Sequence, residues 1–397
     1  MAKYFKCLTN KNPIVYTVGE EIEFTVFARE DGDNITCENV KWILEGDDGQ
    51  KFEDQATITP ESPLTLKYTL KRAGFVHLKC NAVDEKGEKI EGFDQLDSSV
   101  GANVFDITYS DTLPEDFDEF WNKIKKMVAD TDVKVVYYEE KAPDFKPGYR
   151  VFRVMIETPC GRPASGCVTI PITDKKLPIR IYFLGYGVHA AYFEYDENKI
   201  CACFNAHGFE NDKNDDQLSE IYGKELSWYG FDEQQNASNE TTYFYKMMIR
   251  NLMALKYLKT LPEWNGKDIL SVGGSQGALQ AITLGAHDQD VTEVIAYKPW
   301  FCDIPAENYG YLAGWRPKPA QGLRYFDTVA QVTRVKCPIT IQCYLGDYVC
   351  PPKTVMALYN SANLKKRIEF FQSATHSYFS PETDKNIPEF VWEENKL

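Results

Sequence analysis

The chain has 397 residues, more than one ordinary hydrophobic core holds, so its length suggests two domains. Hydrophobic residues make up 43% of the sequence and aromatic residues 14%, which excludes an intrinsically disordered chain. The formal net charge of −15 argues against a nucleic-acid partner and against an anionic membrane surface, because both would repel the protein.

The eleven cysteines are odd in number, so they cannot all pair within one chain. Most lie in apolar runs, as Cys167, Cys337 and Cys343 do, where buried free thiols are expected. This usage favours a reducing compartment, and Cys201 and Cys203 lack the spacing of zinc ligands. Residues 1–10 contain no apolar signal region, and no run is apolar and long enough to span a membrane. We expect a cytoplasmic protein. The alternative is a periplasmic or secreted protein whose signal peptide is absent from this chain.

The first hundred residues have the pattern of β-strands. Segments 14–28, 39–46, 64–71 and 74–84 contain alternating apolar and polar positions and are separated by Gly, Asp, Asn and Pro clusters. Short strands at this spacing predict a β-sandwich domain over residues 1–108, of the immunoglobulin-like kind. Its histidine, His77, lies within an alternating strand and is expected to be structural.

Residues 109–397 have a different pattern. The segment 111–128 begins with Asp, Thr and Pro and continues with Phe117, Phe120, Trp121 and Ile124 at helical spacing. Apolar strands and amphipathic helices then alternate, which predicts a mainly parallel sheet with helices on both faces. Expected strands are 149–158, 177–185, 199–206, 267–273, 293–300, 338–346 and 367–374, and expected helices are 243–261, one from Gln276, and 354–360.

Ser275 is the candidate nucleophile. It lies in a Gly-x-Ser-x-Gly pattern with Gly273 and Gly277, directly after an apolar strand and directly before a helical segment. The small residues allow a sharp turn that projects the serine hydroxyl above the sheet at a helix N-terminus. Backbone amides and the helix dipole can stabilise negative charge there. The arrangement predicts an α/β-hydrolase fold with a serine nucleophile.

The base follows from elimination among five histidines. His77 lies in the predicted β domain, and His287 falls near the end of the helix that follows the nucleophile. His189 and His207 precede the nucleophile, whereas this fold orders its triad as Ser, acid, His along the chain. His376, in a loop after a late apolar strand, remains as the candidate base.

The acid should lie between Ser275 and His376, at the end of a strand. The strand 338–346 leads into Asp347, which lies 29 residues before His376. Asp303 and Asp327 are alternatives, although neither follows a comparably clear strand. An acid here would orient the imidazole and stabilise the imidazolium that forms during acyl transfer.

Several segments after residue 110 resemble the acetyl xylan esterase and cephalosporin-C deacetylase family, carbohydrate esterase family 7. They are DFDEFW at 116–121, GGSQGA at 273–278, FCD at 301–303, YFD at 325–327 and GDYVCPPKTVMALYN at 346–360. The last segment resembles the one in which the family's triad aspartate precedes a Cys-Pro-Pro turn, which favours Asp347 over its rivals. By resemblance, FLGYG at 183–187 is the oxyanion strand, with Leu184 where the family usually has His.

The resemblance implies an oxyanion hole formed by the backbone amides of Tyr186 and Gln276. The Gln276 amide also follows from the fold, because the residue after the nucleophile supplies one donor. Two motifs depart from the family: His207, Gly208 and Phe209 replace Arg-Gly-Gln, and Ser377 follows His376 in place of Glu. The sequence is compatible with a homo-oligomer, although these changes and the added β domain argue against the family's hexamer.

We therefore predict a serine esterase that removes O-acetyl groups from a carbohydrate through an acyl-enzyme, without metal or organic cofactor. Trp300 and Trp315 are candidate walls of the substrate pocket that stack on sugars. Two alternatives stay open. Another serine hydrolase, such as a feruloyl esterase or a peptidase, would use the same triad. A non-catalytic carbohydrate-binding protein would require the triad to be accidental.

Overall fold

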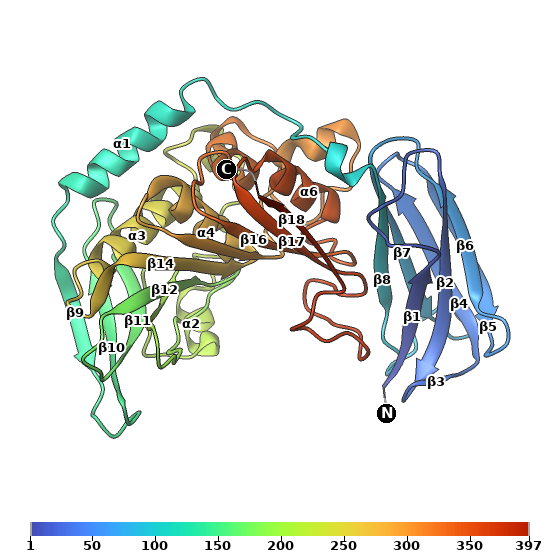
Figure 1. The fold of residues 1–397 in the computed structure, drawn as a ribbon, viewed down its shortest axis with the longest axis horizontal. Helices are drawn as coiled ribbons and strands as arrows, with labels where there is room; N and C mark the ends of the chain where they lie inside the picture. The colour runs from blue at the N-terminus through green and yellow to red at the C-terminus, as the bar shows by residue number, and fades with distance from the viewer. Residues whose placement is uncertain (1, 396–397) are drawn as a thin grey trace.

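A computed structural model describes residues 2–395 (Figure 1). The N-terminal part folds into two antiparallel four-stranded sheets, one of order β1-β2-β3 with β6 also paired to β2, and one of order β5-β4-β7-β8. Its strands are β1 (Lys3–Thr9), β2 (Glu21–Glu30), β3 (Asp33–Asn34), β4 (Cys37–Gly46), β5 (Lys51–Ile58), β6 (Leu64–Thr69), β7 (Gly74–Ala82) and β8 (Leu96–Ala102).

The two sheets form a sandwich around one apolar core. Phe24 and Val26 of β2 share this core with Leu44 of β4, Leu78 of β7 and Val100 of β8. The alternating segments around 39–46, 64–71 and 74–84 are strands as predicted, whereas 14–28 contributes a strand only from residue 21 onward. Alternation misses β1, β3, β5 and β8. That the sandwich is immunoglobulin-like stays a prediction.

The C-terminal part is built on one ten-stranded sheet of order β18-β17-β16-β15-β14-β12-β13-β11-β10-β9. Strands β13, β12, β14, β15, β16 and β17 run parallel to one another, and the flanking strands pair antiparallel. Their bounds are β9 (Val135–Glu140), β10 (Tyr149–Ile156), β11 (Ala164–Pro171), β12 (Leu177–Phe183), β13 (Ile200–Asn205), β14 (Trp264–Gly274), β15 (Glu293–Tyr297), β16 (Ile339–Tyr344), β17 (Lys365–Phe371) and β18 (Phe390–Asn395).

Helices pack against this sheet, and two of the longer ones are mostly buried. These are α3 (Tyr243–Leu258), which contacts β10 and β11, and α4 (Gln276–His287), which contacts β12, β14 and β15. The remaining helices are α1 (Phe117–Asp130), α2 (Asp215–Tyr222), α5 (Thr328–Val332), α6 (Pro352–Ser361) and the 3-10 helices η1 (Val104–Asp106), η2 (Gln235–Ala237), η3 (Ile304–Tyr309) and η4 (Gln321–Tyr325). Among the described residues, no helix has the length and apolar character needed to cross a membrane.

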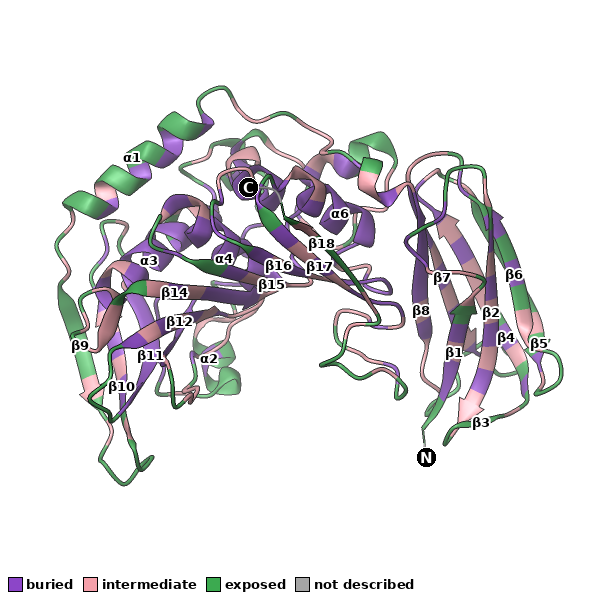
Figure 2. Ribbon diagram, in the orientation of Figure 1, coloured by how far each residue is buried: buried purple, intermediate pink, exposed green. Residues whose placement is uncertain are grey.

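The sandwich and the α/β part are in contact. Strand β8 is the edge of its sheet, yet all but one of its residues are buried, in contrast to the exposed edge strand β5 (Figure 2). Phe75 and Ile14 of the sandwich belong to the apolar cluster that fills the α/β part. The predicted boundary after residue 108 lies between the end of β8 and the start of α1, and it stays a prediction.

Candidate active site

Ser275 occupies a sharp turn between β14 and α4. Its φ is 56° and its ψ is −122°, a conformation that non-glycine residues rarely adopt and that is typical of functional sites. Its N–H donates to the Tyr297 carbonyl over 2.9 Å, which holds the turn against the end of β15. A Cβ on Gly277 would collide with the Phe183 carbonyl, so the second glycine of the motif lets α4 lie close to β12.

The predicted acid and base lie side by side. Asp347 is 0% exposed, and its Oδ2 lies 2.7 Å from Nδ1 of His376. Its Oδ1 accepts hydrogen bonds from the N–H groups of Val349 and Cys350, both at 2.9 Å. These bonds fix the carboxyl group, which in turn fixes the imidazole ring. Because Nδ1 is engaged, Nε2 is the nitrogen of His376 left to act on a substrate or nucleophile.

Residues 297–300 link the nucleophile to the base. The Trp300 N–H donates to the Ser275 carbonyl over 3.2 Å, and the Lys298 ammonium donates to the carbonyl of His376. Burial lowers the pKa of Lys298, opposed by the nearby Asp347 carboxyl group. Sequence reasoning missed Lys298, and no motif marks it. Among the described residues, the Ser275 and His376 side chains share no hydrogen bond, which is common in enzymes without bound substrate.

The predicted oxyanion residues border the same turn. A Cβ on Gly185 would lie 4.0 Å from Cβ of Ser275, so the loop that carries Tyr186 runs beside the nucleophile. Gln276 is the first residue of α4, where the backbone N–H has no partner within the helix. Tyr229 connects α4 to the loop that carries Tyr186, because its hydroxyl donates to Gln276 Oε1 over 2.9 Å and accepts the Gly187 N–H over 3.1 Å.

His207 and His189 form hydrogen bonds with the backbone carbonyls of this loop. His207 Nε2 lies 2.8 Å from the Gly187 carbonyl, and its Nδ1 lies 2.6 Å from the Tyr243 hydroxyl. Burial disfavours the imidazolium and lowers the pKa of His207 to about 3, so the ring is neutral. His189 Nε2 lies 3.2 Å from the carbonyl of Tyr186. The residue that replaces the family's arginine therefore anchors the predicted oxyanion loop.

The other histidines and aspartates that the sequence offered have structural partners elsewhere. His287 is buried at the far end of α4, bonded to Gln331 over 2.7 Å, and burial lowers its pKa to about 3. Asp303 pairs with the ammonium of Lys353. Asp327 accepts three backbone N–H groups. None of these contacts involves Ser275 or His376, which favours Asp347 as the acid.

A cluster of aromatic side chains lies beside the nucleophile, and one of them differs from its predicted role. Trp300 is 2% exposed and packs beneath Trp315, with ring centroids 5.5 Å apart, so its indole cannot stack on a sugar. Trp315 is half-buried and contacts Tyr186 edge-on at 4.7 Å. Trp228, which sequence reasoning missed, is 63% exposed, has a φ of 55° and lies 6.0 Å from Trp315. No motif or periodic pattern in the sequence marks Trp228, because it lies in a loop.

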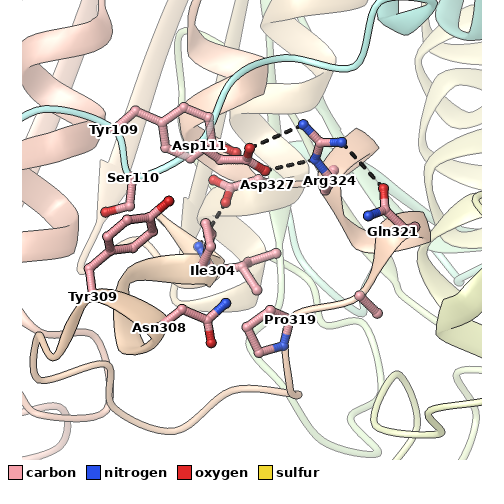
Figure 3. Close-up of a pocket in the computed structure, with 12 residues that line it drawn as sticks. Tyr109, Ser110, Asp111, Ile304, Asn308, Tyr309, Pro319, Gln321, Arg324 and Asp327 are labelled. Carbon is pink, nitrogen blue, oxygen red and sulfur yellow. Dashed lines mark hydrogen bonds and ion pairs between the residues drawn. The ribbon is translucent and has the colours of Figure 1, made fainter.

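A separate pocket of about 460 Å³ lies between the segment before α1 and the 304–327 segment (Figure 3). Arg324 donates to the Asp111 carboxylate through two nitrogens, at 2.7 and 3.1 Å. Asp327 also lines the pocket, and burial raises the pKa of its carboxyl group to about 7. None of the three predicted reacting residues lines this pocket, and its charged groups are already paired, so we do not assign the reaction to it.

Asp347, Cys350 and His376 also place potential metal-binding atoms within 4.8 Å of one another. Burial raises the pKa of the Cys350 thiol well above its usual range, so it remains a protonated, weak ligand. The Asp347 oxygens are engaged by two N–H groups and the imidazole. This donor set fits an acid–base pair better than a metal centre.

The sequence pattern of the acetyl xylan esterase (AXE1) family matches residues 105–307 and 318–394. The chain belongs to this family. It is therefore a carboxylic ester hydrolase, and the matched residues include those of the Ser275 turn and the Asp347–His376 pair. The match begins near the end of the sandwich.

Individual relatives agree with this assignment. The acetyl esterase Axe7A of Xylanibacter ruminicola is 26% identical over 345 residues, which cover 77% of this chain and 73% of that protein. The acetyl xylan esterase of Paenibacillus sp. R4 superposes with a TM-score of 0.59 at 17% identity, over 70% of this chain and 94% of its own. Acetyl xylan esterase 1 of Thermoanaerobacterium sp. JW/SL YS485 gives 0.56 at 20% identity, over 70% and 93%. These structures support the α/β-hydrolase fold of the C-terminal part.

Proposed function

We propose that this esterase removes O-acetyl groups from a carbohydrate, with Ser275 as nucleophile, His376 as base and Asp347 as acid. The observations that carry the proposal are the Asp347–His376 hydrogen bond of 2.7 Å and a serine held in a strained turn at a helix N-terminus. Family membership supports carbohydrate esterase chemistry, and the acetyl group is proposed from the named activities of the relatives.

In the proposed reaction, Nε2 of His376 takes the proton of the Ser275 hydroxyl as the oxygen attacks the ester carbonyl. The negative charge on the carbonyl oxygen is stabilised by the backbone N–H groups of Tyr186 and Gln276. When this intermediate collapses, the bond to the sugar oxygen breaks, and that oxygen takes the proton from His376 to become a hydroxyl group, which leaves an acetyl-serine. Water then attacks the acetyl-serine, with His376 again acting as base and then as acid, and acetate leaves.

The aromatic residues beside the turn support a carbohydrate substrate. Tyr186, Trp315 and Trp228 form a continuous series of ring contacts that leads from the predicted oxyanion loop to solvent. Exposed indole rings stack on the apolar faces of sugars. The strained backbone of Trp228 is consistent with such a functional role, since non-glycine residues with positive φ cluster at ligand sites.

Covalent labelling tests the proposal. A fluorophosphonate should modify the native enzyme at Ser275, and Ser275→Ala should abolish both the label and most of the hydrolysis of p-nitrophenyl acetate, without loss of fold by circular dichroism. Acetate release from acetylated xylo-oligosaccharides should exceed ferulate release from feruloylated ones. Esterase activity retained in a folded Ser275→Ala variant would contradict the nucleophile, and a preference for feruloyl esters would contradict the acetyl substrate.

A further inference from the structure

We infer that the β-sandwich is a positioning element for the reaction: His77 and Ser99 hold Tyr348, and Tyr348 fixes the orientation of the neighbouring Asp347. The inference rests on the proposed role of Asp347 as the triad acid. All the proposed reacting groups lie after residue 108, so the sandwich supplies no reacting group in this scheme. It acts through the loops that carry the acid and the base.

Tyr348 is clamped between the two parts of the molecule. The imidazole of His77, on β7, stacks on its ring with centroids 3.6 Å apart and an interplanar angle of 12°. The Ser99 hydroxyl, on β8, lies 3.0 Å from the Tyr348 hydroxyl. His77 is itself fixed, because its Nε2 lies 2.7 Å from a carboxyl oxygen of Asp97. A stacked face and a bonded hydroxyl together restrict both the tilt and the rotation of the phenol ring.

Further contacts hold the acid loop on both sides of Asp347. A Cβ on Gly346 would collide with the carbonyl of Asp97, so the backbone before the acid lies directly on β8. The residues after Tyr348 donate their N–H groups to Asp347 Oδ1. A shift of Tyr348 therefore moves the backbone on both sides of the carboxyl group and changes its distance from His376.

The sandwich holds the base loop as well. The Ser98 hydroxyl donates to the Gln372 carbonyl over 3.2 Å, at the start of the segment that carries His376. The Tyr378 hydroxyl donates to Asp94 over 2.9 Å, two residues after the base. Figure 1 shows the segment between β17 and β18, in red, lying beside the sandwich. The loops that carry the acid and the base are therefore both held by β8 and by sandwich residues close to it.

The arrangement accounts for two features of the sandwich surface. His77 and Asp97 form a polar pair on β7 and β8 that adds nothing to the apolar core. Strand β8 is also buried along a face that an isolated sandwich would expose to water. Both features are expected if the surface of β7 and β8 packs against the loops that carry the acid and the base.

The test uses point variants of the full chain. Tyr348→Ala removes the side chain that is clamped, and His77→Ala removes the imidazole of the sandwich that stacks on it. Tyr348→Phe keeps the stack and loses only the bond to Ser99. We expect kcat for p-nitrophenyl acetate to fall about 10- to 100-fold in Tyr348→Ala, because misplacement on the order of 1 Å can cost 100-fold. KM should change less than about twofold, because the clamp does not contact substrate.

A matched control breaks the same interface elsewhere. Arg72 donates to the carbonyls of Tyr309 and Gly310 over 3.0 and 2.9 Å, and touches neither catalytic loop. Arg72→Gln should therefore lower stability without lowering kcat per folded molecule. In a double-mutant cycle, His77→Ala should add little to Tyr348→Ala, since both remove the same contact.

The outcomes separate this inference from the proposed function. If Tyr348→Ala, or His77→Ala where the first does not fold, keeps kcat within twofold of the native value while Asp347→Asn is nearly inactive, the positioning role is overturned and the triad stands. An equal loss of kcat in Arg72→Gln also overturns it, because the effect would then belong to domain association in general. Activity retained in Asp347→Asn would overturn the triad, and this inference with it.

Discussion

Replacement of Asp347 by asparagine tests the proposed triad with a change of one atom. The side chain is fully buried, so the variant changes hydrogen-bonding character with almost no change in volume. Oδ1 accepts the N–H groups of Val349 and Cys350 at 2.9 Å, and an asparagine oxygen in this position keeps both bonds. The asparagine NH2 group then faces Nδ1 of His376, in place of the carboxyl oxygen at 2.7 Å.

This reversal forces the wrong tautomer on the base. Nδ1 must accept a hydrogen bond from the amide, so the ring proton moves to Nε2, and Nε2 can no longer take a proton from Ser275. The alternative amide orientation directs the NH2 group at two backbone N–H donors, which leaves all three groups unpaired. The variant also loses the charge that stabilises the imidazolium. We expect kcat/KM to fall roughly 10³- to 10⁴-fold, equivalent to about 4–5.5 kcal/mol of transition-state stabilisation.

The assay is steady-state hydrolysis of p-nitrophenyl acetate, with circular dichroism to confirm folding and Ser275→Ala to define the background rate. Residual activity of Asp347→Asn should lie near that background. A folded variant that loses less than about tenfold would refute the reasoning, because the tautomer argument leaves no route to a small effect. Asp303→Asn and Asp327→Asn would then be the next variants to assay for kcat, since these residues were the sequence alternatives.

Three further predictions concern the acyl group, the sugar and pH. Hydrolysis of p-nitrophenyl acetate should exceed that of the octanoate ester by at least about 10-fold in kcat/KM if the acyl pocket excludes long chains, and the reverse order would contradict an acetyl substrate. Trp228→Ala should raise KM for acetylated xylo-oligosaccharides about 10-fold and leave p-nitrophenyl acetate unaffected, with Trp228→Phe as the control that keeps a stacking ring. His287→Gln should be less destabilising at pH 5 than at pH 7.5 by about 2 kcal/mol, measured by urea unfolding at both values. The sign follows because the pKa of His287 is about 3 in the folded protein, so the native chain loses stability as pH falls below about 6.5, and the variant lacks this term.

Sequence patterns predicted the local elements that chain neighbours determine. The apolar strand, the glycines and the following helix gave the Ser275 turn, and the structure adds the φ of 56°. Helical spacing gave α1, which spans Phe117–Asp130. Elimination by chain order gave His376, and the strand end gave Asp347, and these two side chains are hydrogen-bonded. The turn, the helix and the strand end are local signals, whereas the choice of His376 rests on the order of residues along the whole chain.

Exposure within the site was less predictable. Trp300 and Trp315 both follow a strand in the same region, and nothing in their order distinguishes a buried indole from one at a surface. The structure separates them: the indole N–H of Trp300 donates to the backbone carbonyl of Trp315 over 2.6 Å, and the Trp300 side chain is buried. Trp228 lies in a segment without periodicity, so only the folded chain places it near Trp315.

The contacts of Tyr348 explain why the role of the sandwich could not be inferred from the sequence. His77 lies 271 positions before Tyr348, and in its own strand it reads as an ordinary alternating residue. Its partner Asp97 lies on the neighbouring strand β8, which the alternation did not mark. Only the packing of β7 and β8 against the acid loop brings the three residues together. A domain that contributes no reacting group can therefore still fix the position of a reacting group in another domain. Its contribution should appear as a change in kcat.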